Sequence, residues 1–312
     1  MPQSIQWYPG HMHKAARELR QRMSEIRVVV ELRDARIPHS SRNPVLASVL
    51  GDKPLLILLT KSDLADPLIT DVWSREIRID EGAVLATVGK QSTMTPEQLT
   101  RHVLNLTSQS QIPSDGISIL VAGVPNVGKS TFINRLVGKS IAKTGNEPAV
   151  TRQQQRLELG NGLVLFDTPG VLWPKVENPS SGLRLAATGG IRDTAYSHED
   201  VGYFLFEFLR TAYPDRLQER FGVSDFSGDI SDMLDTAGRF RGALKSGGQV
   251  DLDRLSKIVI TDLREGRLGR VSLETPEMIA EEEILVEKAR VAREKKRAER
   301  KQRFKKTINQ RT

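Results

Sequence analysis

The 312-residue sequence contains no cysteine, and this absence excludes disulfide bonds and metal sites built on thiolates. It also contains no apolar run that approaches the roughly 20 residues a helix needs to cross a bilayer. The first residues, MPQSIQWYPGHMHKAAREL, become polar at once and lack the apolar segment of a secretory signal peptide. These absences predict a cytoplasmic protein with no membrane partner.

The net charge of +7 is unevenly distributed along the chain. Residues 288–312 contain twelve lysines and arginines, opposed only by Glu294 and Glu299, so this segment has a charge of +10 and the rest of the chain −3. Such a segment cannot bury apolar surface, which predicts a solvated helix or a disordered arm. Its expected partner is a polyphosphate such as RNA, although a tail that only solubilises the protein would have the same composition.

Apolar runs alternate with helical patterns through roughly the first 175 residues. Continuous apolar runs separated by helices are typical of a parallel sheet that is covered on both faces, so an α/β fold is expected. The expected strands are 28–33, 55–60, 83–88, 117–123, 152–159 and 163–167.

The pattern changes after residue 175 to apolar residues at helical spacing. In SHEDVGYFLFEFLRTAYP (197–214) they fall on one helical face, so the aromatic residues there are predicted to be core. The predicted organisation is an N-terminal segment and helix (1–27), an α/β domain (28–175), a small all-helical domain (176–276) and a basic tail (277–312).

A candidate phosphate loop, GVPNVGKS (123–130), lies between an apolar run and a predicted helix. It fits the pattern G-x-x-x-x-G-K-[ST], in which backbone amides at a helix N-terminus surround the phosphates. Lys129 is predicted to reach the β- and γ-phosphates, and the Ser130 hydroxyl to bind Mg²⁺. The predicted contacts in this loop are Pro125, Asn126, Val127, Gly128, Lys129, Ser130 and Thr131.

A second phosphate-side motif, DTPG (167–170), ends the apolar run LVLFD. Asp167 is predicted to hold Mg²⁺ through water, and the Gly170 amide to contact the γ-phosphate. Thr151, in the loop between the two motifs, has the position of a threonine that completes the Mg²⁺ shell. Mg²⁺ is therefore the expected cofactor, with Ser130, Thr151 and Asp167 as its ligands.

The apolar run LLILLT ends in TKSD (60–63), which is typical of a loop that recognises guanine. The Asp63 carboxylate would accept hydrogen bonds from guanine N1–H and the exocyclic amine, which adenine does not offer in that arrangement. The aliphatic stem of Lys61 is expected to pack along the base. Thr60 stands where asparagine is usual, and its hydroxyl would supply part of the same contact. ATVG (86–89) weakly matches a last base-contacting loop.

The guanine-reading half (28–108) precedes the phosphate-binding half (117–173), which is a circular permutation of the usual GTPase order. A permutation requires only that the original ends can be joined and that the new break falls in a surface loop. Residues 109–116 are the predicted join. The expected fold is an α/β P-loop GTPase domain with permuted motif order, followed by a small all-α domain and a basic tail.

The sequence resembles the circularly permuted GTPases of ribosome assembly, and among them the bacterial ribosome biogenesis GTPase A group. The resemblance extends over nearly the whole chain up to about Pro276. It rests on IQWYPGHMHKA (5–15), ELRDARIPHSSRNP (31–44), TKSD, GVPNVGKS and DTPGVLWPK (167–175).

This resemblance implies a protein that binds the precursor of the large ribosomal subunit and its rRNA. It would use the GTP-to-GDP cycle to time a late assembly step, and nothing in the sequence demands more than a monomer. Two positions depart from the family pattern, Thr60 in place of asparagine and Ala149 in place of glycine, and both affect the expected nucleotide affinity.

Hydrolysis is expected to be slow without a partner, because Val171 follows DTPG where many GTPases have a glutamine that orients water. Besides Lys129, the resemblance implies two catalytic groups. Asn126 has the position at which similar GTPases bind K⁺, although an asparagine there can also brace the loop. His11 resembles the family's candidate catalytic histidine, although a capping or packing role near a helix start is the alternative.

The segment IPHSSRNP (37–44) forms a polar loop after the first expected strand. A cap for the following helix explains part of it, and contact with RNA would explain Arg36 and Arg42. The two explanations have similar weight.

Two other functions remain open from the sequence. One is an RNA-binding assembly chaperone with a weak or vestigial nucleotide site, which the basic tail favours and the intact phosphate loop opposes. The other is a GTPase that acts on tRNA or the small subunit and shares all of these motifs.

Overall fold

A computed structural model describes Ile5 and residues 10–81, 84–90, 93–138, 155–168, 172–173 and 176–309. By its internal contacts the chain forms two units, Met1–Glu274 and Thr275–Thr312. The first unit contains the sheet and the helical region that follows it. The second contains one long helix.

The first unit is built on a mixed sheet with the strand order β3-β2-β1-β4-β6-β5. Neighbouring strands are parallel except for the hairpin of β5 and β6. The α/β fold predicted from the alternating runs is therefore confirmed. The strands are β1 (Val28–Asp34), β2 (Leu55–Thr60), β3 (Val84–Thr87), β4 (Ile117–Gly123), β5 (Gln155–Glu158) and β6 (Leu163–Asp167).

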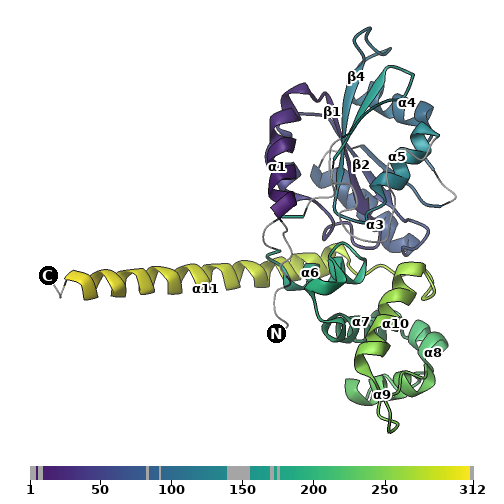
Figure 1. Ribbon diagram of the computed structural model, residues 1–312, viewed down its shortest axis with the longest axis vertical. Helices are drawn as coiled ribbons and strands as arrows, with labels where there is room; N and C mark the ends of the chain where they lie inside the picture. Colours follow the sequence, from purple (N-terminus) through teal and green to yellow (C-terminus); the bar gives the residue numbers. More distant parts are fainter. Residues whose placement is uncertain are drawn as a thin grey trace. The chain divides into compact units, whose positions relative to one another are not determined.

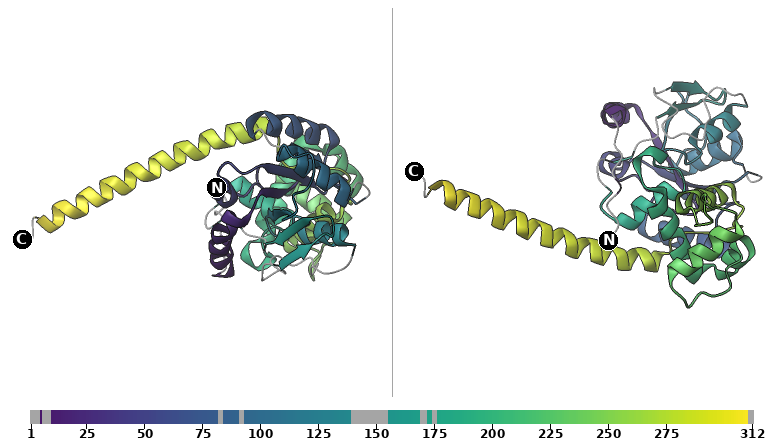
Figure 2. Two further views of the ribbon diagram at one scale, coloured as in Figure 1. Left: turned by 90° about the horizontal axis from the view of Figure 1, so that it is seen from above. Right: turned by 60° about the horizontal axis from the view of Figure 1, so that its bottom comes forward.

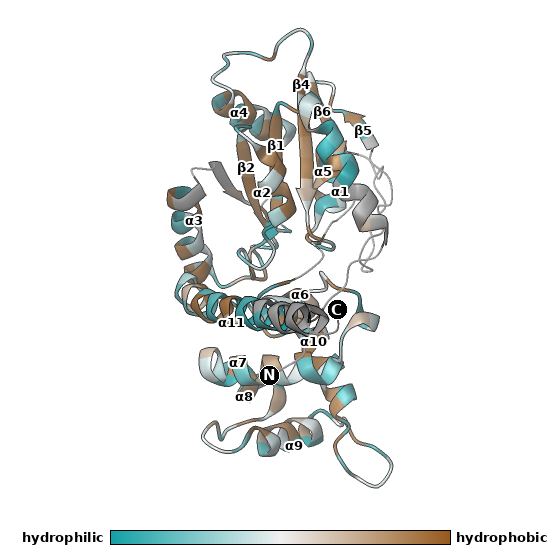
Figure 3. Ribbon diagram, turned by 90° about the vertical axis from the view of Figure 1, so that its left-hand side faces the viewer, coloured by the Kyte–Doolittle hydropathy of each residue, from teal (hydrophilic) through white to brown (hydrophobic). Residues whose placement is uncertain are grey.

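Helices cover both faces of this sheet (Figure 1). Val28 and Val30 of β1 share an apolar cluster with α4 and α5, whereas Val29 points to the other face and clusters with α1 and α2. This alternation follows from the two-residue period of a strand. Strands β2 and β4 are hydrophobic along most of their length (Figure 3), as expected for strands buried on both faces. The helices are α1 (Gly10–Arg22), α2 (Pro44–Leu50), α3 (Pro67–Glu81), α4 (Pro96–Leu106) and α5 (Lys129–Val137).

The helical region shares its apolar core with the α4 and α5 face of the sheet. Within α7, Val201, Leu205 and Leu209 are fully buried, and Phe204 and Phe208 are partly buried against the same core, as their spacing indicates. Gly202 lets α7 approach α10 closely, because a Cβ atom there would lie 2.2 Å from the Ser256 Oγ. The helices are α6 (Pro179–Ala187), α7 (His198–Ala212), α8 (Pro214–Phe221), α9 (Ile230–Phe240) and α10 (Leu252–Glu265).

The second unit is the single helix α11 (Pro276–Asn309), which has no break along its length (Figure 2). Ile279 near its start is buried, whereas the larger apolar side chains Ile284, Leu285 and Val291 are exposed. Among the helices that the structure describes, none combines the length and the apolar character needed to cross a membrane.

The strand order decides where the functional loops lie. The carboxyl ends of parallel strands fall on one edge of a sheet, and ligands of α/β proteins bind beyond that edge. Asp34 is paired with Thr60, Leu32 with Gly123, and Val121 with Asp167. The loops after β1, β2, β4 and β6 therefore leave the sheet side by side.

We predict that Gly202→Ala lowers the free energy of unfolding by about 1–3 kcal/mol, because the added methyl group would overlap Ser256, including its backbone. Urea denaturation measures this loss. Gly228→Ala is the matched control, since the nearest atom to its new Cβ would lie 3.7 Å away. Equal stability of the two variants would contradict the close packing of α7 on α10.

Candidate guanine-nucleotide site

Four loops meet at the carboxyl edge of the sheet, and they contain the motifs singled out in the sequence. TKSD follows β2, the phosphate loop follows β4, and Asp167 ends β6. Strand β1 lies between β2 and β4, so Asp63 and Lys129 belong to the same edge although their order in the chain is inverted. Motifs that are permuted in the sequence therefore lie together at one edge of the folded sheet.

The phosphate loop turns sharply between β4 and α5. Asn126 and Gly128 have φ angles of 57° and 100°, in the left-handed region. Gly123 has no room for a side chain, because a Cβ atom would lie 2.8 Å from the Leu32 carbonyl oxygen. Helix α5 begins at Lys129, so Ser130 and Thr131 lie in its first turn, where free amides and the helix dipole favour an anion.

Lys129 and Asp167 form a buried ion pair through Nζ and Oδ1. Asp167 is fully buried and Lys129 is 6% exposed. Burial raises the pKa of Asp167, and the neighbouring Lys129 ammonium lowers it again in part. The other oxygen, Oδ2, has no hydrogen-bond partner in the part of the chain that the structure describes.

A buried carboxylate oxygen without a partner is costly, so Asp167 fits a role in which a hydrated cation is held near it. Mg²⁺ takes oxygen ligands and keeps several waters, which agrees with this donor set. The Asp167 carboxylate and the Ser130 hydroxyl are the described residues that fit such an ion.

The Thr60 hydroxyl connects the guanine-reading loop to the phosphate loop. Its Oγ1 lies 2.6 Å from the Val127 carbonyl oxygen and 3.1 Å from that of Arg33. A hydroxyl has one proton, so the shorter contact is the better donor bond. Thr60 is 3% exposed, and it therefore makes a contact to the phosphate loop from the position where asparagine is usual.

Asp63 faces the loop that follows β3. Its Oδ1 accepts a hydrogen bond of 3.1 Å from the Lys90 amide, and a Cβ atom on Gly89 would lie 2.8 Å from the same oxygen. Arg135 of α5 also binds the Gly89 carbonyl oxygen, at 3.1 Å. The weak sequence match at 86–89 thus belongs to a segment that lies against the Asp63 carboxylate.

Lys61 makes an ion pair that the sequence analysis did not anticipate. Its Nζ lies 2.9 Å from Oδ2 of Asp34, the last residue of β1. Asp34 also accepts a two-pronged contact from Arg36, at 2.9 and 2.8 Å. Burial alone would raise the pKa of Asp34, but the two cations hold it well below its usual range. Burial lowers the pKa of Lys61, and Asp34 opposes this shift.

Arg36 is 1% exposed, and its remaining Nη1 donates to the Leu263 carbonyl oxygen at 3.1 Å. The suggestion that Arg36 contacts RNA is therefore wrong, because the ion pair with Asp34 and the contact with α10 bury its guanidinium. Arg42 is exposed. Asn43 accepts hydrogen bonds from Val45 and Leu46 and so caps α2. In the sequence, the ion pair with Asp34 could have been suspected only from the position of Arg36, two residues after that aspartate.

Asn126 links the phosphate loop to the helical region. Its Nδ2 donates to the Gly189 carbonyl oxygen at 2.9 Å, just beyond the end of α6. Arg264 of α10 binds the carbonyl oxygens of Ala186 and Ala187 nearby, at 2.8 and 3.0 Å. This bracing contact is compatible with either role considered for Asn126, and binding of K⁺ stays a prediction.

Several predicted site residues are not placed by the structure. Thr151 and Gly170 lie outside the described residues, as do Ala149 and Val171. The backbone of His11 lies at the start of α1, and its side chain is outside the described part. The roles given to these residues remain predictions.

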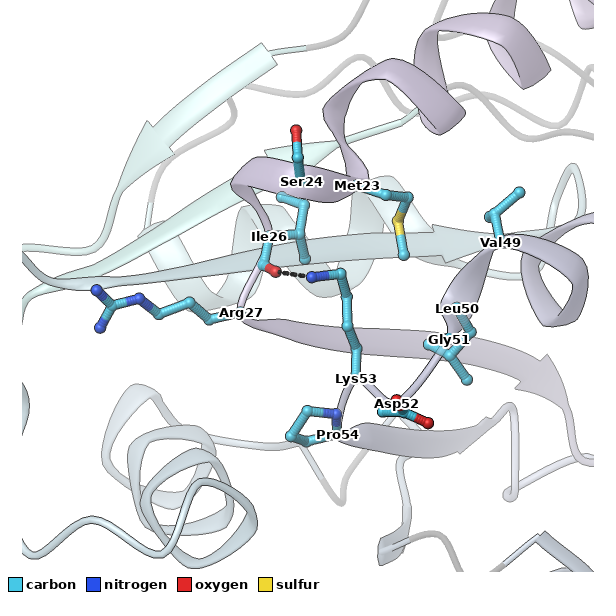
Figure 4. Close-up of a pocket in the computed structure, with 10 residues that line it drawn as sticks. All are labelled: Met23, Ser24, Ile26, Arg27, Val49, Leu50, Gly51, Asp52, Lys53 and Pro54. Atoms are coloured by element: carbon cyan, nitrogen blue, oxygen red, sulfur yellow. Dashed lines mark hydrogen bonds between the residues drawn. The ribbon is translucent and has the colours of Figure 1, made fainter.

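A pocket lies at the opposite edge of the sheet, near the amino ends of β1 and β2 (Figure 4). Lys53 crosses it and donates to the Ile26 carbonyl oxygen at 2.7 Å. None of the predicted nucleotide contacts lines it, so the candidate site remains the carboxyl edge. The residues that line the pocket are Met23, Ser24, Ile26, Arg27, Val49, Leu50, Gly51, Asp52, Lys53 and Pro54.

Comparison with known proteins shows which family this chain belongs to. A family model described as 50S ribosome-binding GTPase matches residues 118–207. The ribosome biogenesis GTPase A of Bacillus cereus is 40% identical over 291 residues, which cover 91% of this chain and 98% of that protein. The ribosome biogenesis GTPase A of Thermotoga maritima is 30% identical over 276 residues, which cover 88% and 96%.

Two solved structures of YlqF are also similar to this chain over most of its length. The GDP-bound structure has a TM-score of 0.59 and 28% identity, covering 83% of this chain and 99% of that chain. The GNP-bound structure from T. maritima has a TM-score of 0.59 and 27% identity, covering 85% and 99%. Since relatives match at up to about two-fifths identity over nearly their full lengths, and the permuted motifs meet at one edge of the sheet, this chain belongs to the ribosome biogenesis GTPase A family.

Proposed function

We propose that this GTPase binds GTP and GDP at the carboxyl edge of its sheet and uses hydrolysis to time late maturation of the large ribosomal subunit. The observation that supports the site best is the hydrogen bond from Thr60 to Val127, which joins the base-reading loop to the phosphate loop. One nucleotide would contact both loops at once. Asp63 would read the base while Lys129 holds the phosphates.

The phosphate-side roles follow from the ion pair of Lys129 and Asp167. When nucleotide binds, the Lys129 ammonium would exchange the carboxylate for the β- and γ-phosphates. Asp167 would then hold the Mg²⁺ hydration shell, while Ser130 and Thr151 supply hydroxyl ligands. Mg²⁺ would neutralise phosphate charge during hydrolysis.

Hydrolysis is proposed to be slow in the isolated protein and faster on the ribosomal particle. Val171 has no polar group that orients water, so the missing contributions would come from K⁺ held by Asn126 and from His11. The description of the matching family, 50S ribosome-binding GTPase, supports the large-subunit precursor and its rRNA as partners. A cytoplasmic monomer is the proposed state.

We predict that more protein co-sediments with precursors of the large subunit in a non-hydrolysable GTP analogue than in GDP. Removal of residues 288–312 should leave particle-stimulated hydrolysis in place and reduce only the salt-sensitive part of binding, because this segment would contribute phosphate contacts. Lys129→Ala, which removes the phosphate contact, is the control for nucleotide dependence.

Binding that ignores the nucleotide would instead support the RNA-binding chaperone. Preference for the small subunit or for tRNA would redirect the proposal to those partners.

We predict that Gly89→Ala weakens GDP binding about tenfold, which corresponds to roughly 1.4 kcal/mol. The added methyl group would lie 2.8 Å from the Asp63 carboxylate and displace it from the base. Titration with a fluorescent GDP analogue measures the change, and Gly228→Ala provides the same substitution in open surroundings. Unchanged affinity would remove Asp63 and Gly89 from the base site.

A further inference from the structure

The guanine-reading loop is hydrogen-bonded to a segment that lies about 200 residues later in the chain. Arg270 donates from Nε to the Ala65 carbonyl oxygen at 2.9 Å and from Nη2 to that of Ser62 at 3.0 Å. The neighbouring Val271 amide donates to the Leu64 carbonyl oxygen at 3.0 Å. Three carbonyl groups of the loop thus have donors from one short stretch after α10.

A second set of contacts holds the end of the same loop. The Asp66 amide donates to Ser272 Oγ at 3.1 Å, and the Asp66 carboxylate accepts from the Tyr213 hydroxyl at 3.1 Å. The Ser272 amide donates to the Tyr213 oxygen at 3.2 Å. Burial, together with Asp66, raises the pKa of Tyr213 to about 12, so its hydroxyl remains protonated and donates at neutral pH.

These contacts bear directly on Asp63. Asp63 lies between Ser62 and Leu64, and the carbonyl groups of both neighbours are held by the segment 270–271. Its carboxylate must face two donors on guanine at once, and such recognition tolerates errors of only about 0.5 Å in position. The backbone on either side of Asp63 therefore determines how well it reads the base.

We propose that Arg270 is a positioning residue for guanine recognition. It bridges the carbonyl groups of Ser62 and Ala65 and so sets the Asp63 carboxylate against the base. The inference rests on the proposed function, in which Asp63 binds guanine. The segment after α10 then holds the loop that binds the base. A partner that moves residues 266–272 away from this loop lowers the affinity for guanine without contacting the nucleotide.

The test compares GDP with IDP, which lacks the exocyclic amine and so offers Asp63 one donor fewer. Removal of the Arg270 contacts in Arg270→Ala should weaken GDP binding roughly five- to tenfold and IDP binding less, so that the GDP/IDP preference falls. Arg270→Lys keeps a cationic donor and should restore part of the preference. Arg254→Ala removes another exposed arginine, from α10, and should change neither affinity.

Arg270 is exposed but makes two hydrogen bonds to the loop, so the melting temperature of each variant is measured first and the competition titrations are made on folded protein. A GDP/IDP ratio in Arg270→Ala equal to that of the unaltered protein would overturn the positioning role and leave the proposed function intact. An unaltered protein that does not distinguish GDP from IDP would overturn both. A ratio that falls equally in Arg254→Ala would also overturn the specific role of Arg270.

Discussion

The nucleotide site depends on a short hydrogen bond between two loops that are distant in sequence. The Thr60 hydroxyl, buried at the end of β2, donates to the Val127 carbonyl oxygen in the phosphate loop after β4. Strand β1 lies between those two strands, so the bond connects loops two positions apart on the same edge. It joins the loop proposed to read the base to the loop proposed to hold the phosphates, whichever of the two the chain encodes first.

Buried charges hold the rest of this edge. Asp34 accepts hydrogen bonds from both Lys61 and Arg36, and Arg36 also donates one to the Leu263 carbonyl oxygen of α10. Asp34 is the acceptor that the two cations share, so its removal would leave the buried Arg36 guanidinium without its carboxylate partner. Lys61 of the TKSD loop is therefore coupled to the helical region through Asp34 and Arg36. At the phosphate end, Asn126 makes a comparable contact to Gly189. Both ends of the candidate site thus contact the helical region.

Much of this arrangement could be predicted from the sequence, because the phosphate loop and TKSD each lie within a few residues at the end of a strand, and Asp167 of DTPG ends another. Their spacing and order along the chain also predicted the permuted GTPase fold. The contacts of Arg36 with Leu263 and of Arg270 with Ser62 could not be predicted, because each joins segments more than 200 residues apart and leaves no local period or motif. Arg36 shows the difficulty clearly. As a basic residue in a polar loop it resembles an RNA contact, and only the tertiary structure shows it buried on Asp34. Gly89 could have been recognised from the sequence only through the weak match of residues 86–89 to a base-contacting loop. Its role depends on the tertiary structure, because a side chain there would overlap the Asp63 carboxylate.

The central claim is that Asp63 and Lys129 contact one guanine nucleotide from opposite ends, and exchange of the base tests it most directly. An amide in place of the Asp63 carboxylate keeps one acceptor oxygen for N1–H and can donate to the 2-oxo group of xanthine, but it loses the second acceptor that the exocyclic amine of guanine requires. Equilibrium titration of GDP and XDP should therefore show a preference for GDP in the unaltered protein and for XDP in Asp63→Asn. Lys129→Ala should weaken both nucleotides without changing the preference. An Asp63→Asn variant that retains the original preference for GDP would contradict the account.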